Sequence, residues 1–109
     1  MKGPITQERM EQALDYLSDT DESCAALRAD MARTEFKAKA VRAAMVKLSP
    51  GTSASAREAE ADTSKEVADA WETHFKAMRE HDAMKNKRAT QAIVFEAWRS
   101  LNSNRRQAQ

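Results

Sequence analysis

The chain has 109 residues, enough for one domain, and its composition excludes several classes of protein. Charged residues make up 32% of the sequence but the formal net charge is only +1, which argues against a simple polybasic nucleic-acid binder. Cys24 is the single cysteine, so no intramolecular disulfide is expected. The sequence contains neither an apolar run as long as a membrane span nor the apolar core of a signal peptide. We therefore expect a soluble protein of the cytoplasm that binds no membrane.

Glycine and proline are rare, which favours long helices. The two glycines and two prolines lie at positions 3–4 and 50–51, so the rest of the chain lacks the usual signals for turns. Alanine, glutamate, lysine and arginine are abundant, whereas valine and isoleucine are scarce. This composition predicts an all-α fold.

The first predicted helix covers residues 7–18. Thr6 is a suitable N-cap, and apolar residues recur at helical spacing from Ile5 to Leu17. The sequence Ser-Asp-Thr-Asp-Glu at 18–22 then predicts a cap or a kink, after which a second helix begins.

The second predicted helix, residues 20–48, carries the clearest pattern in the sequence. Its apolar positions are spaced 3-4-3-4-3-4-3, which is the heptad pattern of a coiled coil. The residues of this seam are Cys24, Leu27, Met31, Thr34, Ala38, Val41, Met45 and Leu48. Several of them are small, so a partner helix can approach closely but each heptad buries little apolar area. We expect Cys24 to be a buried, unreactive thiol.

The third predicted helix, residues 55–101, follows a turn at Pro50-Gly51. The capping box from Ser55 to Glu58 marks its start, and Thr63 is a second candidate start. Its apolar stripe consists of Val67, Trp71, Phe75 and Met78 and continues with Ala89, Ile93, Ala97 and Leu101. Residues 102–109 are polar and are expected to form a flexible tail.

Charge alternates between segments along the chain. Residues 8–22 hold six acidic residues and one basic residue, whereas residues 33–47 hold five basic and one acidic. Residues 57–82 hold eight acidic and four basic residues, and residues 83–109 hold six basic and one acidic. An antiparallel fold would place opposite charges together, although an exposed ion pair contributes only about 0.2–1 kcal/mol.

The heptads and the charges together predict a long, coiled-coil-like antiparallel hairpin with a short N-terminal helix. The same charge pattern can act between chains, so we also expect an oligomeric bundle.

No pattern for catalysis or for cofactor binding stands out. His74 and His81 are seven residues apart on one helix face, but a zinc site would need a further ligand. The sequence has no glycine-rich phosphate loop and no base suited to activate Cys24. We expect no enzyme activity, no metal or cofactor, and no small-molecule substrate.

The C-terminal residues are the best candidates for function. Trp98 could stack on a base or fill a pocket of a protein partner, while Arg99, Arg105 and Arg106 contact phosphates or carboxylates. The alternative is that Trp98 packs in the core and that the arginines only solvate the end of the helix, where cations suit the helix dipole.

The sequence also resembles a family. The turn Ser-Ala-Arg-Glu-Ala-Glu-Ala at 55–61, and above all the ending Trp-Arg-Ser-Leu-Asn-Ser-Asn-Arg-Arg at 98–106, are similar to small helical proteins of temperate bacteriophages. Such proteins are encoded in the early region, near genes for single-strand-annealing recombinases and single-strand-binding proteins. The resemblance implies phage DNA metabolism in a bacterial cytoplasm and carries no catalytic residues.

From the resemblance and the charge pattern we expect a non-catalytic accessory protein of phage recombination or replication. It would bind a protein partner, associate with copies of itself, and offer a basic end to single-stranded DNA. Two alternatives are an inhibitor of a host nuclease or defence complex and a purely structural helical oligomer.

Overall fold

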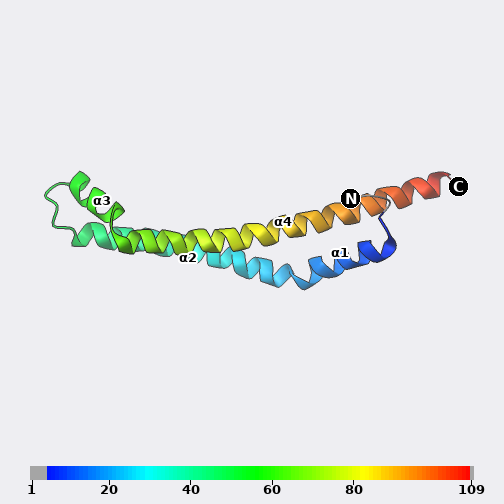
Figure 1. Cartoon of the computed structure of the whole chain (residues 1–109), viewed down its shortest axis with the longest axis horizontal. Helices are drawn as coiled ribbons and strands as arrows, with labels where there is room; N and C mark the ends of the chain where they lie inside the picture. Colours follow the sequence, from blue (N-terminus) through cyan, green and yellow to red (C-terminus); the bar gives the residue numbers. More distant parts are fainter. Residues whose placement is uncertain (1–4, 109) are drawn as a thin grey trace. The chain divides into compact units, whose positions relative to one another are not determined.

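The computed structural model describes residues 5–108, and the side chains of residues 5–105. Within this range the chain forms four helices and no strand (Figure 1). The helices are α1 (Gln7–Asp19), α2 (Asp21–Leu48), α3 (Ala54–Asp62) and α4 (Lys65–Ala108). The predicted all-α class is confirmed. None of the described helices is both long enough and apolar enough to cross a bilayer.

The chain groups into two compact units. Unit 1 contains α1, the first turn of α2 up to Ala25, and α4 from Asp82 onward. Unit 2 runs from Ala26 to His81 and contains most of α2, all of α3 and the first part of α4. The two long helices therefore each contribute to both units.

In unit 1, the predicted break between the first two helices lies at Thr20. Thr6 caps α1 as predicted, because its Oγ1 accepts a hydrogen bond of 3.1 Å from the Arg9 backbone N–H. Thr20 donates its backbone N–H to the carbonyl of Tyr16, and its own carbonyl accepts from Cys24 N–H. One residue therefore ends α1 and begins α2. The buried apolar residues of this unit are Met10, Ala13, Cys24 and Val94.

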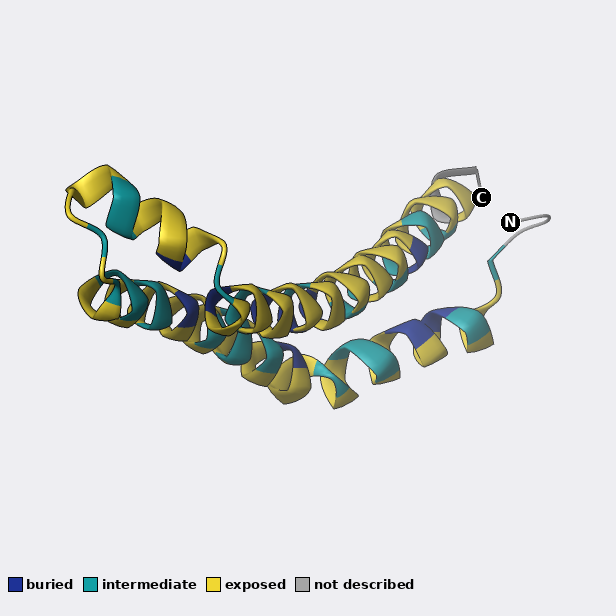
Figure 2. Ribbon diagram, turned by 60° about the vertical axis from the view of Figure 1, so that its left-hand side comes forward, coloured by how far each residue is buried: buried dark blue, intermediate teal, exposed yellow. Residues whose placement is uncertain are grey.

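In unit 2, α2 and the first part of α4 run antiparallel and side by side (Figure 1). The buried side of each helix faces the other, and the outer sides are exposed (Figure 2). The buried residues are Ala38, Ala61, Val67, His74, Ala77 and His81. No large side chain in the described part of the chain is less than 2% exposed. The predicted hairpin is confirmed, and its two helices bury no large side chain completely between them.

The corner between α2 and α4 differs from the prediction in two ways. The N-cap of α3 is Ser53, which accepts from Ala56 N–H at 3.1 Å, rather than Ser55. The predicted helix 55–101 is also interrupted, because Ser64 caps both sides of a break. Its Oγ donates to the carbonyl of Ala61 at 2.6 Å and accepts from Val67 N–H at 3.3 Å. The helix therefore restarts at the second candidate start, and α4 begins directly after Ser64.

The C-terminal end of α4 also differs from the prediction. The helix continues to Ala108, through residues 102–108 that were expected to form a tail. Neither glycine nor proline occurs after Gly51, so the two residue types that stop a helix most strongly are absent after Leu101.

Candidate functional site

The predicted seam of α2 lies mainly on the inner side of the helix. Cys24 and Ala38 are buried; Leu27, Met31, Thr34, Val41 and Met45 are half-buried. Leu48 departs from the expected seam, with 76% of its surface exposed. The chain turns away at Ser49 directly after it, so Leu48 only borders a small recess beside Glu60 and Ala61.

Near the middle of the predicted stripe on α4, the buried position is occupied by the residue before the predicted one. Val67 is buried and Trp71 and Met78 are half-buried, but Phe75 is 42% exposed. His74 takes the inner position instead and is 4% exposed. Its Nδ1 lies 3.1 Å from Thr34 Oγ1, a hydrogen bond between α4 and α2. This contact satisfies the imidazole inside the seam, which leaves the outer position to Phe75.

An aromatic group surrounds His74 on α4. Trp71 meets the His74 ring edge-on, with ring centroids 5.6 Å apart, and stacks on Phe75 at 6.0 Å. His81 lies one heptad further on and is also buried. Across the described residues, no set of three His, Cys, Asp or Glu side chains is arranged to hold a metal ion. Both histidines thus belong to the seam between helices.

Arg88 fastens α1 to α4 in unit 1. Its Nη1 donates to the carbonyl of Leu17 and to Thr20 Oγ1, both at 2.7 Å. Its Nη2 donates to Asp21 Oδ1 at 3.3 Å. The Leu17 carbonyl belongs to the last turn of α1, which lacks partners within the helix. A guanidinium at a helix C-terminus also interacts favourably with the helix dipole.

Sequence reasoning did not single out Arg88, which lies in a polar stretch of the last predicted helix. The signal that could have identified it is the combination of a predicted helix end at 18–22 and an opposing basic segment at 83–109. A helix end inside a fold needs donors for its carbonyls, and arginine supplies several from one side chain. Lys87 adds a second contact, with its Nζ 5.2 Å from the centre of the Tyr16 ring.

Two ion pairs join segments that the charge pattern predicted to be neighbours. Arg88 and Asp21 connect the basic C-terminal segment to the acidic N-terminal one. Arg42 Nε lies 2.6 Å from Asp62 Oδ1 and connects α2 to α3. The hydrogen bond from Arg42 lowers the pKa of Asp62 below its usual value, and the same hydrogen bond raises the pKa of Arg42.

The Arg42–Asp62 pair predicts a small pH dependence of stability. Because the pKa of Asp62 is lower in the folded chain, its contribution is present above the pKa of an unfolded aspartate and is lost as the pH falls through the folded value. We expect Asp62→Asn to lower Tm slightly at pH 7, with the difference from the wild type vanishing in acid. Thermal melts followed by circular dichroism between pH 2 and 7 measure this, with Asp30→Asn as a control within one helix. A difference that grows in acid would contradict the assignment.

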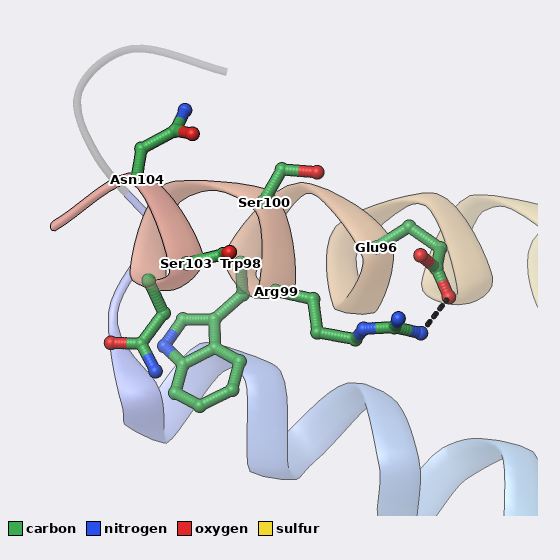
Figure 3. Close-up of a pocket in the computed structure, with 7 residues that line it drawn as sticks. Glu96, Trp98, Arg99, Ser100, Ser103 and Asn104 are labelled. Carbon is green, nitrogen blue, oxygen red and sulfur yellow. Dashed lines mark ion pairs between the residues drawn. The ribbon is translucent and has the colours of Figure 1, made fainter. Parts of the chain in front are cut away.

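The C-terminal candidate residues lie on one segment of α4 in unit 1. Trp98 is half-buried, which agrees with partial packing, and Figure 3 shows its indole on the side of α4 where the ribbon of α1 passes. Arg99 points back along the helix to Glu96, with Nη1 and Oε1 3.5 Å apart, and both side chains are more than 60% exposed. Arg105 is exposed. Arg106 belongs to α4, but its side chain lies outside the described residues.

A recess of about 470 Å³ lies along this segment. Trp98 and Arg99 line it together with short polar side chains, among them Ser100, Ser103 and Asn104 (Figure 3). All of its lining residues come from α4, so it is a surface hollow on a single helix. Its polar side chains can donate hydrogen bonds to a polar ligand and accept them from it, but they do not enclose a cavity.

An apolar stripe on another side of the same segment is partly exposed. Ile93, Ala97 and Leu101 follow one another at intervals of four; Ile93 is 68% exposed, Leu101 is 43% exposed, and Ala97 between them is half-buried. Val94, next to Ile93, turns inward and is 4% exposed. The sequence placed Ile93 and Leu101 on the inner stripe, and the structure places Val94 there instead. We call Ile93, Ala97 and Leu101 the α4 stripe.

A groove lies between α2 and α4 in unit 2, with a volume of about 440 Å³. Its floor is largely apolar and contains Val41, Ala44, Met45 and Ala70. Lys37 borders it on the α2 side, and Glu66 and Asp69 border it on the α4 side. Thr34 and Thr73 complete the lining, and we call this feature the α2–α4 groove. Thr34, Val41 and Met45 belong to the predicted seam, but sequence reasoning missed the groove because its other residues lie beside the seam and on a second helix.

The recess along α4 and the α2–α4 groove both lie at the surface of the described part of the chain. No family model, no curated protein and no solved structure matches this chain.

Proposed function

We propose that this protein is a non-catalytic interaction protein that binds a protein partner through the α4 stripe. The observation that carries the proposal is the exposure of Ile93 and Leu101, two large apolar side chains on one face of a helix. Single exposed apolar residues are ordinary on protein surfaces, but a contiguous apolar face is typical of a binding site.

The chemistry of the stripe indicates what kind of partner fits it. Apolar residues at intervals of four suit a helix that lies in an apolar groove of another protein. Arg99 and Arg105 are exposed on the same segment, so acidic side chains at the rim of the partner's groove would be favoured. The partner would therefore offer an apolar groove with an acidic rim.

The proposed setting is phage DNA recombination or replication, which rests on the similarity of residues 98–106 to small helical phage proteins. In that setting a single-strand-annealing recombinase is the first partner to test. Single-stranded DNA is a second ligand, because Trp98 can stack on a base and Arg99, Arg105 and Arg106 can contact phosphates.

The test combines pull-down on a single-strand-annealing recombinase with gel shift on oligodeoxythymidine. We expect the double variant Ile93→Glu, Leu101→Glu to weaken binding to the recombinase at least about 30-fold, since the loss of a hot-spot residue at the centre of an interface costs about 2 kcal/mol or more. The control is Phe36→Glu, which replaces a large apolar side chain of unit 2 that is 76% exposed with a single glutamate.

The outcomes are distinct for the two ligands. Loss of DNA binding in Arg99→Glu, Arg105→Glu with retained recombinase binding would assign the basic end to DNA. If the wild type binds neither the recombinase nor oligodeoxythymidine, the proposed setting is contradicted. Equal effects of the stripe variant and the Phe36 control would contradict the proposed surface.

A further inference from the structure

The α2–α4 groove has one basic side and one acidic side. Lys37 is exposed on the α2 side, whereas Glu66 and Asp69 are exposed on the α4 side. Between them, Val41, Met45 and Ala70 are only half-buried, and the floor residue Ala44 is exposed. Within the part of the chain that the structure describes, the ion pairs join other residues than these three, so the groove presents their charges at its rim.

A surface divided in this way is complementary to a second copy of itself. Consider a second hairpin laid face to face on the groove, related by a two-fold axis that runs along the groove, parallel to the helices. This rotation places α2 of each copy over α4 of the other, and it keeps each residue at the same level along the axis. Lys37 of each copy then lies over Glu66 and Asp69 of the other, and the apolar floors face one another.

The alternative two-fold axis, perpendicular to the helices, is disfavoured by the charges. It would place α2 of one copy over α2 of the other. Residues 33–47 of α2 hold five basic residues and one acidic residue, so this contact would be repulsive. The charges of unit 2 thus select one arrangement, in which every neighbouring pair of helices is antiparallel.

We propose that two copies of the chain associate through the α2–α4 groove of unit 2 and form an antiparallel four-helix bundle. The packing between α2 and α4 supports this proposal, because the most buried residue there is the small Ala38 and several larger apolar side chains remain half-buried. A second layer of helices would cover Val41, Met45 and Ala70. The proposal concerns a different surface from the α4 stripe and does not depend on the partner bound there.

The expected affinity is modest. Within unit 2, α4 contributes only residues 65–81 to the groove face, and interfaces that bury less than about 1,200 Å² usually belong to transient complexes. Because rim charges set the orientation, the association should also weaken as the salt concentration rises.

The test is a charge reversal with rescue, measured by sedimentation equilibrium of the full chain at low salt. We expect the wild type to show a concentration-dependent monomer–dimer equilibrium. Lys37→Glu and Asp69→Lys should each raise the dissociation constant at least about tenfold, because each places like charges opposite one another. The double variant Lys37→Glu, Asp69→Lys should restore it to within about threefold of the wild type.

The matched control is Lys39→Glu, which reverses an exposed lysine of α2 that does not border the groove. Circular dichroism verifies that each variant keeps its helical content. A wild type that stays monomeric at all concentrations would overturn the proposal. So would a dimer that Lys37→Glu leaves intact, or one that Lys39→Glu disrupts equally, because then another face forms the contact.

Discussion

Replacing Arg88 with alanine is expected to destabilise unit 1 by about 2–3 kcal/mol. The substitution removes donors from the Leu17 carbonyl, from Thr20 Oγ1 and from the Asp21 carboxylate at once. α1 has 13 residues, a length at which an isolated helix is marginal in water. Without Arg88 its C-terminal turn loses its anchor on α4, and α1 should open locally.

Hydrogen exchange with residue resolution measures this effect where it occurs. In Arg88→Ala the amides of α1 should exchange much faster, while those of α2 between Ala38 and Leu48 should change little. Arg88→Lys keeps the positive charge but loses the planar set of guanidinium donors. The exchange rates of its α1 amides should therefore lie between those of the wild type and those of Arg88→Ala. The control is Lys85→Ala, an exposed neighbour on α4. Unchanged exchange in α1 would show that Arg88 does not fasten it.

Placing glutamate at Ala38 is expected to destabilise unit 2 by about 3 kcal/mol or more. Ala38 is 0% exposed and lies on the buried side of α2. A glutamate there must either bury an unpaired charge or push the two helices apart. Either result disrupts the neighbouring contact between Thr34 and His74.

Urea unfolding followed by circular dichroism gives the free energy of unfolding for this variant. The control is Ala40→Glu, which introduces the same side chain two residues away at an exposed position of the same helix. We expect a change within about 0.5 kcal/mol for the control. If the two variants unfold at the same urea concentration, α2 and α4 do not pack through Ala38.

The architecture could be predicted from the sequence because its signals are local and agree with one another. The N-cap at Thr6, the break near Thr20 and the corner at Pro50-Gly51 each depend on a few adjacent residues. The alternating charges then favoured an antiparallel hairpin, and the pairs Arg88–Asp21 and Arg42–Asp62 join the expected segments.

The details that were predicted wrongly depend on contacts between distant residues. Phe75 is more apolar than His74, so hydrophobicity alone placed Phe75 inside. His74 takes the inner position instead, because Thr34, forty residues away in the sequence, forms a hydrogen bond with it. Val94 likewise replaces Ile93 on the inner side of α4. Each of these two residues fits a helical pattern of apolar positions, and the two patterns differ by one residue.

The candidate surfaces were only partly visible in the sequence. The segment with Trp98, Arg99 and Arg105 could be selected from its residue types. The α2–α4 groove could not, because it combines residues of two helices whose relative rotation is set by the seam. Arg88 was hidden for a similar reason, since its acceptors include a backbone carbonyl that no sequence pattern displays.

The small size of the most buried seam residues has a consequence for how the protein responds to heat. Unfolding a seam whose most buried positions hold mainly alanine and imidazole hydrates less new hydrocarbon than unfolding one that buries leucine there, and newly hydrated hydrocarbon is the main source of the heat capacity change. The curve of stability against temperature should therefore be shallow. A shallow curve keeps the balance between folded and unfolded chains nearly constant over a wide range of temperature, at the expense of a high maximum.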